Sequence, residues 1–264
     1  MPEATYPSQK FDPKNRYVTS YLFSSSTLGS IRLLLGFYAL VTNLVVLIYD
    51  GVRLEIADTY FSYFTHLSYI GLTAWLWASG VQTVAFANAL KNGEEPRYPL
   101  QSWPRIFGFL HEYLYTTIAT FPFIVTIVYW VLLASSGSFS DGFNSWTNVS
   151  QHIMNSVFAL FELLLTDLPP LRYIQLPCTI VTLGLYLGVA YITHSTQGFY
   201  PYAFLDPKKE GALLAAYILG IAAGQIIVFL IVRLGICLRI LAVDRRRRGS
   251  LEHNHHDEYE KAVV

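Results

Sequence analysis

Long stretches without a charged residue constrain the fold more than any other feature of the sequence. Between Asp58 and Lys91 lie 32 consecutive uncharged residues, and between Arg172 and Asp206 lie 33. A helix that crosses a bilayer needs only about 20 predominantly apolar residues. Only helices and closed barrels satisfy their backbone in lipid, and these runs are too long and too irregular for alternating barrel strands. The sequence therefore predicts an all-α fold, a polytopic transmembrane helical bundle.

Six segments have this apolar character. The predicted spans are residues 31–49, 64–90, 105–134, 148–168, 174–194 and 211–241. They divide the chain into a polar N-terminal tail (1–28), a six-span transmembrane domain (29–242) and a C-terminal tail (243–264) that is first basic and then acidic. Arg32 lies close to one end of the first span, so we expect its guanidinium to reach the interface by snorkelling.

Composition excludes several classes of function. The 18 basic and 18 acidic residues cancel, so nothing in the overall charge indicates a nucleic-acid partner. Cys178 and Cys237, the two cysteines, both lie in apolar runs and cannot build a disulfide framework, a zinc cluster or a haem motif. The histidines at 253, 255 and 256 belong to the acidic tail and are interpreted as surface residues, so we expect no metal site and no cofactor.

The distribution of Lys and Arg predicts the orientation of the bundle. With six spans both termini share one side, and that side carries thirteen basic residues against three in the opposite loops. Cytosolic loops of membrane proteins carry the excess of positive charge. Both termini are therefore expected in the cytosol, where the run Arg245 to Arg248 would also attract anionic lipid.

Three polar residues are predicted at one depth near the non-cytosolic interface. Thr65 lies at the outer end of the second span, and His152 lies about one helical turn below the outer end of the fourth. His194 lies at the outer end of the fifth span. A hydroxyl and an imidazole from different helices can therefore meet in this layer.

A threonine and a histidine in contact can perform acyl transfer. The hydroxyl is a weak nucleophile that needs a neighbouring base, and neutral imidazole is the usual one. Free N–H groups at a helix start could also stabilise an oxyanion. Two plainer interpretations remain open, in which Thr65 only caps its helix and His152 is an interfacial histidine bonded to lipid or a loop.

Glu162 is a separate feature, because a carboxylate inside a span is costly and marks a functional or hydrogen-bonded group. It lies ten residues beyond His152, about 15 Å deeper on the same helix, so it cannot directly orient that ring. Two interpretations stay open, a buried carboxyl bonded to a neighbouring helix and a proton relay.

The order of several short motifs resembles the androgen-induced gene and androgen-dependent TFPI-regulating protein family of polytopic threonine hydrolases. The nucleophile region of that family matches Tyr63-Phe64-Thr65 followed by Leu67. Its Asn, His and Glu spacing matches Asn148, His152 and Glu162. The segment after the fifth span and the third-span aromatic residues also agree in order, at His194, Gly198, Tyr202, Phe204-Leu205-Asp206, Phe121-Pro122 and Tyr129-Trp130.

The resemblance covers roughly residues 60–206 and departs from the family at a few positions. Val149 stands where animal members have a second histidine, and Ala203 stands where the family has a proline, which here is Pro201. The third-span aromatic pair is also two residues closer to Phe121-Pro122. These departures bear on substrate preference more than on Thr65 and His152.

The resemblance implies an integral-membrane hydrolase of fatty acid esters of hydroxy fatty acids, with Thr65 as nucleophile and His152 as general base. Asn148, His194 and Glu162 are possible supporting residues. The expected partners are membrane lipids and a lipid ester substrate, and the expected location is the endoplasmic reticulum, another endomembrane or the plasma membrane.

Two other classes of function remain open from the sequence. One is a small transporter or channel with a polar path, and the other is a non-catalytic membrane scaffold or lipid-binding protein. The residues that would line such a path are Glu162, Arg233, Asn43 and Gln225. The oligomeric state is not predicted.

Overall fold

The computed structural model describes residues 11–263, except for the side chains of residues 136, 137 and 250–263. This part of the chain forms helices and loops without a β-strand, which confirms the all-α prediction. Five helices are long and apolar enough to cross a membrane. They are α1 (Ser25–Val52), α2 (Phe64–Lys91), α3 (Arg105–Val128) with its continuation to Leu133, α6 (Gln175–Gln197) and α8 (Leu213–Val263), whose apolar part lies within Leu213–Gly249.

The segment predicted as the fourth span consists of three consecutive helical pieces. They are α4 (Gly142–Val149), the π-helical turn η5 (Ser150–Met154) and α5 (Asn155–Leu165). The helix begins before the predicted span because Asp141 caps it, accepting a hydrogen bond from the Asn144 backbone N–H at 2.9 Å. α5 packs against α3 and α8, so this segment belongs to the bundle.

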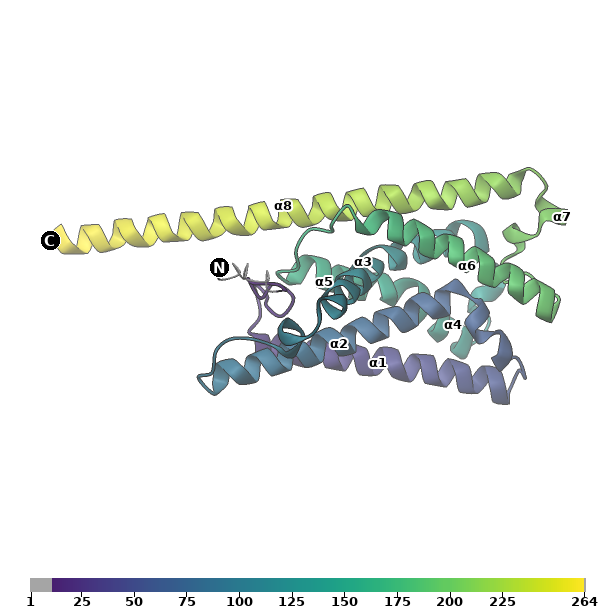
Figure 1. Ribbon diagram of the computed structural model, residues 1–264, viewed down its shortest axis with the longest axis horizontal. Helices are drawn as coiled ribbons and strands as arrows, with labels where there is room; N and C mark the ends of the chain where they lie inside the picture. The colour runs from purple at the N-terminus through teal and green to yellow at the C-terminus, as the bar shows by residue number, and fades with distance from the viewer. Residues whose placement is uncertain (1–10, 264) are drawn as a thin grey trace, which may run out of the picture.

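The helices lie roughly parallel in an elongated bundle (Figure 1). α1 and α2 run side by side along one edge, and α8 runs along the opposite edge and continues past the others. The two ends of the described chain lie toward the same end of the bundle. The short connecting elements are η1 (Ala57–Ser62), η2 (Pro99–Ser102), η3 (Tyr129–Leu133), η4 (Ser136–Phe139), η6 (Ala203–Leu205) and α7 (Pro207–Glu210).

Glycines bring α1 and α2 into close contact. A Cβ atom on Gly29 would lie 2.8 Å from Val84 Cγ2 and 3.2 Å from the Val84 backbone nitrogen. A Cβ on Gly80 would lie 2.9 Å from Leu33. Small residues allow helix backbones to approach closely in lipid, where the hydrophobic effect does not drive helices together.

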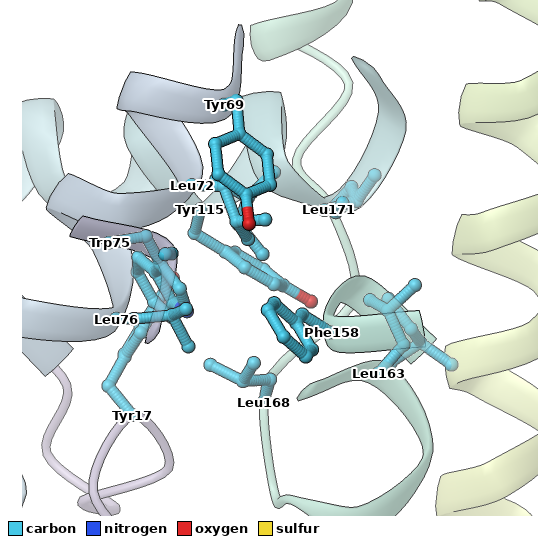
Figure 2. Close-up of a cluster of buried hydrophobic side chains, with 14 of the residues drawn as sticks. Tyr17, Tyr69, Leu72, Trp75, Leu76, Tyr115, Phe158, Leu163, Leu168 and Leu171 are labelled. Carbon is cyan, nitrogen blue, oxygen red and sulfur yellow. The ribbon is translucent and has the colours of Figure 1, made fainter. Parts of the chain in front are cut away.

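Aromatic and leucine side chains form the main core near the end of the bundle where the chain begins (Figure 2). Trp75 of α2, Tyr115 of α3 and Phe158 of α5 are all nearly or fully buried there. Tyr17 packs among them, 5.7 Å from the Tyr115 ring. The described part of the expected N-terminal tail therefore folds onto the bundle.

Hydrogen bonds hold this N-terminal segment, residues 11–23, in place. The Asp12 carboxylate accepts from the backbone N–H groups of Arg16 and Tyr17 and, at 2.8 Å, from the Tyr98 hydroxyl. The Gln101 amide donates to the Asn15 side chain at 2.8 Å. The segment closes the end of the bundle over Arg32.

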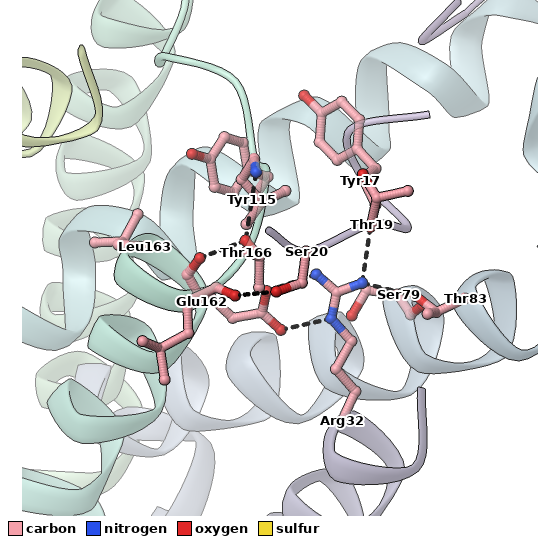
Figure 3. A network of polar contacts seen from close by, with 12 residues as sticks. Tyr17, Thr19, Ser20, Arg32, Ser79, Thr83, Tyr115, Glu162, Leu163 and Thr166 are labelled. Carbon is pink, nitrogen blue, oxygen red and sulfur yellow. Dashed lines mark hydrogen bonds and ion pairs between the residues drawn. The ribbon is translucent and has the colours of Figure 1, made fainter. Parts of the chain in front are cut away.

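The prediction that Arg32 snorkels is wrong. Its side chain is fully buried and forms two hydrogen bonds with the Glu162 carboxylate, Nε to Oε1 at 2.8 Å and Nη2 to Oε2 at 2.6 Å (Figure 3). Its Nη1 atom donates to the Tyr17 carbonyl and to the Thr83 hydroxyl, each at 2.7 Å. The folded N-terminal segment removes the water that a snorkelling arginine would need.

Candidate functional site

Thr65 is the second residue of α2 and does not cap it. The N-cap position is Tyr63, and no side chain caps this helix end. The interpretation of Thr65 as a capping residue is therefore wrong. The side chain is nearly buried, with 8% of its surface exposed, and is placed in the first helical turn.

An apolar cavity of about 200 Å³ lies beside Thr65. Residues of α2, α3, α6, α8 and the η6 turn line it, so five separate parts of the chain meet there. The lining is almost entirely aliphatic and aromatic, with Thr65 and two tyrosines as its polar groups. Its residues are Phe64, Thr65, Ile124, Val125, Val128, Leu133, Ile180, Leu183, Gly184, Tyr186, Leu187, Tyr202, Phe204, Leu205, Ile218, Ile221 and Ala222.

Tyr202 approaches Thr65 from the loop that follows α6. Gly198 ends α6 with φ +82°, a left-handed conformation that glycine adopts without strain, and the chain turns back toward α2. The Tyr202 hydroxyl accepts a long hydrogen bond of 3.4 Å from the Thr65 backbone N–H and lies 3.5 Å from the Thr65 hydroxyl. The Phe204 ring stacks on Tyr202 with a centroid distance of 5.3 Å and fixes its orientation.

His152 lies in the π-helical turn η5, and its ring is fixed by stacking. The Tyr129 ring lies almost parallel to it, at 5° and 3.7 Å between centroids. Tyr129 begins the other π-helical turn, η3, at the end of α3. The Thr126 hydroxyl donates to the His152 carbonyl at 2.7 Å. Two irregular helix segments, a common feature of functional sites, thus face one another here.

No hydrogen bond joins Thr65 to His152 in the described residues, and His152 does not line the cavity beside Thr65. In the described residues the Thr65 hydroxyl has Tyr202 as its partner, and the His152 Nδ1 atom is buried without one. The turn that carries His152 contacts α2. Direct proton transfer between Thr65 and His152 would therefore need a bridging group or a change of conformation.

Asn148 and His194 have other neighbours. The Asn148 amide donates to the Ser138 carbonyl at 2.7 Å and ties the η4 turn to α4. The His194 ring stacks on Tyr200 with 3.9 Å between centroids, at the end of α6. In the described residues neither side chain is hydrogen-bonded to Thr65 or His152.

The Glu162 carboxylate is hydrogen-bonded to Arg32 and lies ten residues beyond His152 in the same helical segment. Both side chains are fully buried, and the carboxylate does not line the cavity beside Thr65. The interpretation of a buried group bonded to a neighbouring helix agrees with this contact, with Arg32 as the partner. In the structure the Glu162 carboxylate therefore joins its helix to α1 through Arg32.

The other residues proposed for the alternative polar path do not bond to one another. Each is hydrogen-bonded to a different neighbour in the bundle. Asn43 donates to the Thr73 hydroxyl at 2.9 Å and accepts from Tyr60. Gln225 donates to the Thr120 hydroxyl at 3.0 Å. Arg233 donates to the Leu171 carbonyl, and its guanidinium lies 4.1 Å from the Tyr173 ring centroid. None of the three lines the cavity beside Thr65.

Comparison with known proteins identifies the family. The model of a family described as FAR-17a/AIG1-like protein matches residues 30–235, more than three quarters of the 264-residue chain. The chain belongs to the FAR-17a/AIG1-like family. The match includes Thr65 and His152 and confirms the resemblance found in the motifs. No curated protein and no solved structure matches the chain.

Three residues of this FAR-17a/AIG1-like site received no role from the sequence. Tyr202 and Tyr129 belong to the sequence motifs described for the family resemblance. The contact of Tyr202 with Thr65 depends on the loop after α6, and the stacking of Tyr129 on His152 depends on two π-helical turns. His66 follows Thr65 directly, and its Nδ1 atom lies 2.7 Å from the Tyr60 carbonyl, which fixes the ring proton on Nδ1 because a carbonyl only accepts. The position of His66 directly after Thr65 is the sequence feature that indicates its place in the site.

Proposed function

We propose that this protein is an integral-membrane hydrolase of lipid esters in which Thr65 is the nucleophile and His152 the general base. The position of Thr65 carries the proposal, because its hydroxyl lies at the start of a helix on the wall of an apolar cavity. Such a cavity excludes water and accepts hydrocarbon chains. Membership of the FAR-17a/AIG1-like family supports the proposal.

The reaction proceeds through an acyl-enzyme. The Thr65 hydroxyl attacks the ester carbonyl while its proton passes to His152, and the carbonyl oxygen becomes an oxyanion. When the tetrahedral intermediate collapses, the protonated His152 supplies the proton to the leaving alkoxide. Water then attacks the acyl group on Thr65 while His152 takes its proton, and His152 returns that proton to the Thr65 oxygen as the fatty acid leaves.

The start of α2 provides hydrogen-bond donors for the oxyanion. Along α2, the first backbone N–H group that donates to a carbonyl of the same helix end is that of Leu67, whose acceptor is the Tyr63 carbonyl. The N–H groups before it have no acceptor in the preceding turn, and that of Thr65 donates only weakly to Tyr202. An oxyanion formed on Thr65 would replace this weak bond by a charge-assisted one.

Two apolar cavities favour a substrate with two acyl chains, such as a fatty acid ester of a hydroxy fatty acid. A second groove of about 320 Å³ runs between α2, α3 and α6. Phe64 and Tyr186 line both this groove and the cavity beside Thr65. A lipid whose ester lies at Thr65 would place one chain on each side of these two rings.

We further propose that both termini face the cytosol, in the endoplasmic reticulum, another endomembrane or the plasma membrane. The excess of basic residues on the terminal side supports this orientation. Thr65 would then lie near the non-cytosolic interface, where the polar ester of a bilayer-embedded lipid is accessible.

Thr65→Val tests the proposal, because valine keeps the shape of threonine and removes the hydroxyl. We expect it to abolish hydrolysis of a branched fatty acid ester and labelling by a fluorophosphonate probe. Thr65→Ser keeps a hydroxyl and is expected to retain both, at a reduced rate. His152→Ala should fail to the same extent as Thr65→Val, and combining the two should add nothing, since residues of one catalytic unit fail together.

Detergent thermal unfolding of each variant separates loss of activity from loss of fold. If folded Thr65→Val protein hydrolyses the ester and reacts with the probe at the wild-type rate, the assignment of the nucleophile is refuted.

A further inference from the structure

A polar pocket of about 320 Å³ lies at the opposite end of the bundle from Thr65. The folded N-terminal segment forms one wall, and the final turns of the apolar part of α8 form the other. Its charged lining consists of four cations and two carboxylates, which gives a formal excess of two positive charges. These residues are Lys14, Arg16, Arg239, Arg247, Asp167 and Asp244.

The cations of this pocket are not neutralised by the carboxylates beside them. No ion pair within 4 Å involves Lys14, Arg16 or Arg247 in the described residues. The excess of two positive charges in the lining is unfavourable, because like charges repel one another. An anion bound between them would remove this cost.

Arg239 is a rigid element of the pocket wall. The residue is 9% exposed, and its guanidinium donates to the carbonyl of Leu163 at 2.6 Å and to that of Leu168. These two bonds orient the planar group and leave other N–H groups available, since a guanidinium has five. The arrangement fits the oxygens of a phosphate, which arginine binds by parallel hydrogen bonds.

Exposed leucines follow or precede pocket residues closely in the chain. Leu238 and Leu241, each about half exposed, are the sequence neighbours of the pocket residues Arg239 and Ile240, and Leu164, also about half exposed, lies three residues before Asp167. In a bilayer these leucines would contact acyl chains. An anion in the pocket can therefore carry hydrocarbon chains that follow this surface.

We propose that this pocket binds the phosphate of a phosphomonoester lipid headgroup, of the phosphatidate type, from the leaflet on the side of the two termini. A phosphate monoester carries about −1.5 to −2 charges near pH 7, which matches the excess of two positive charges in the lining. A diester headgroup carries about one negative charge and matches less well. The site is independent of Thr65 and of the proposed hydrolase activity.

Binding of dioctanoyl phosphatidate to the purified full-length protein in detergent tests the proposal. We expect the lipid to raise the unfolding temperature of the protein in a saturable manner. Lys14→Gln combined with Arg16→Gln should weaken binding roughly thirtyfold, at about fivefold for each charge removed near a membrane surface. Asp167→Asn should act in the opposite direction and tighten binding by about fivefold, because it removes a negative charge from the lining.

Matched variants and other ligands make the test specific. Lys91→Gln combined with Arg97→Gln removes two cations that do not line the pocket and should leave binding unchanged. If the Lys14 and Arg16 variant does not fold, Arg247→Gln on the exposed face of α8 should weaken binding about fivefold. Equal binding by the two double variants would overturn the proposal, as would binding of dioctanoyl phosphatidylcholine or of inorganic phosphate as tight as that of phosphatidate.

Discussion

Replacing Glu162 by glutamine is expected to destabilise the protein by about 3–5 kcal/mol, because it leaves a buried charge without its partner. Glu162 and Arg32 are both fully buried and are joined by bonds of 2.8 Å and 2.6 Å. In Glu162→Gln one of the two accepting oxygens becomes an N–H₂ group, which would face the guanidinium donors. The guanidinium keeps its charge, and water does not reach it.

Removing both charges should cost less than the two single changes added together. In the combined Arg32→Met and Glu162→Met variant no charge is buried alone, and the methionines fill the space. The remaining cost is the loss of the Arg32 bonds to the Tyr17 carbonyl and the Thr83 hydroxyl. The coupling in this double-mutant cycle measures the pair itself.

Thermal unfolding in detergent is a suitable assay, and a loss of about 3–5 kcal/mol corresponds to a drop of roughly 6–20 °C for a chain of this size. Glu112→Gln is the matched control, because the Arg172 side chain in its ion pair is 64% exposed. Exposed pairs contribute about 0–1 kcal/mol, so this variant should unfold close to the wild type. If Glu162→Gln unfolds at the same temperature as Glu112→Gln, the buried pair is not what stabilises this end of the bundle.

Three further outcomes are expected. Gly29→Ala should lower the unfolding temperature because its methyl group would collide with α2, whereas Gly71→Ala, with nothing within 4 Å, should leave it unchanged or raise it. Tyr98→Phe removes the 2.8 Å bond to Asp12, worth about 1.5–3 kcal/mol for a charged acceptor, so limited proteolysis should cut the N-terminal segment faster. Tyr202→Phe should lower kcat for ester hydrolysis by about ten- to a hundredfold with little change in KM, if its hydroxyl positions the Thr65 hydroxyl; an unchanged kcat would remove Tyr202 from the site.

The spans were predictable because exclusion of charge from hydrocarbon acts on each segment separately. Five predicted spans correspond to long apolar helices, and the fourth corresponds to the α4 to α5 segment. The prediction that Arg32 snorkels failed because it also considered one segment alone. Within that segment, the short distance from Arg32 to the helix end favours an interfacial position. Its burial depends on the N-terminal segment and on Glu162, which lies 130 residues away in the chain.

For the candidate site, the sequence predicts the depth of the residues but not the orientation of their side chains. Counting residues along straight helices places Thr65 and His152 in one layer. The direction of the His152 ring depends on a π-helical turn and on stacking with Tyr129. The spacing of hydrophobic residues in the sequence predicts neither the turn nor the stacking. The contact of Tyr202 with Thr65 depends on the loop after α6, whose path no local pattern specifies.

The pairing of Arg32 with Glu162 has a consequence for biosynthesis. The ribosome adds 130 residues between these two positions, which takes about 6–26 seconds at about 5–20 residues per second. During this time the first helix has entered the translocation machinery with an arginine whose counterion has not been made. Its stable insertion must therefore wait for the fourth crossing, so the first helix is expected to stay beside the translocon, or with an insertion chaperone, until Glu162 emerges.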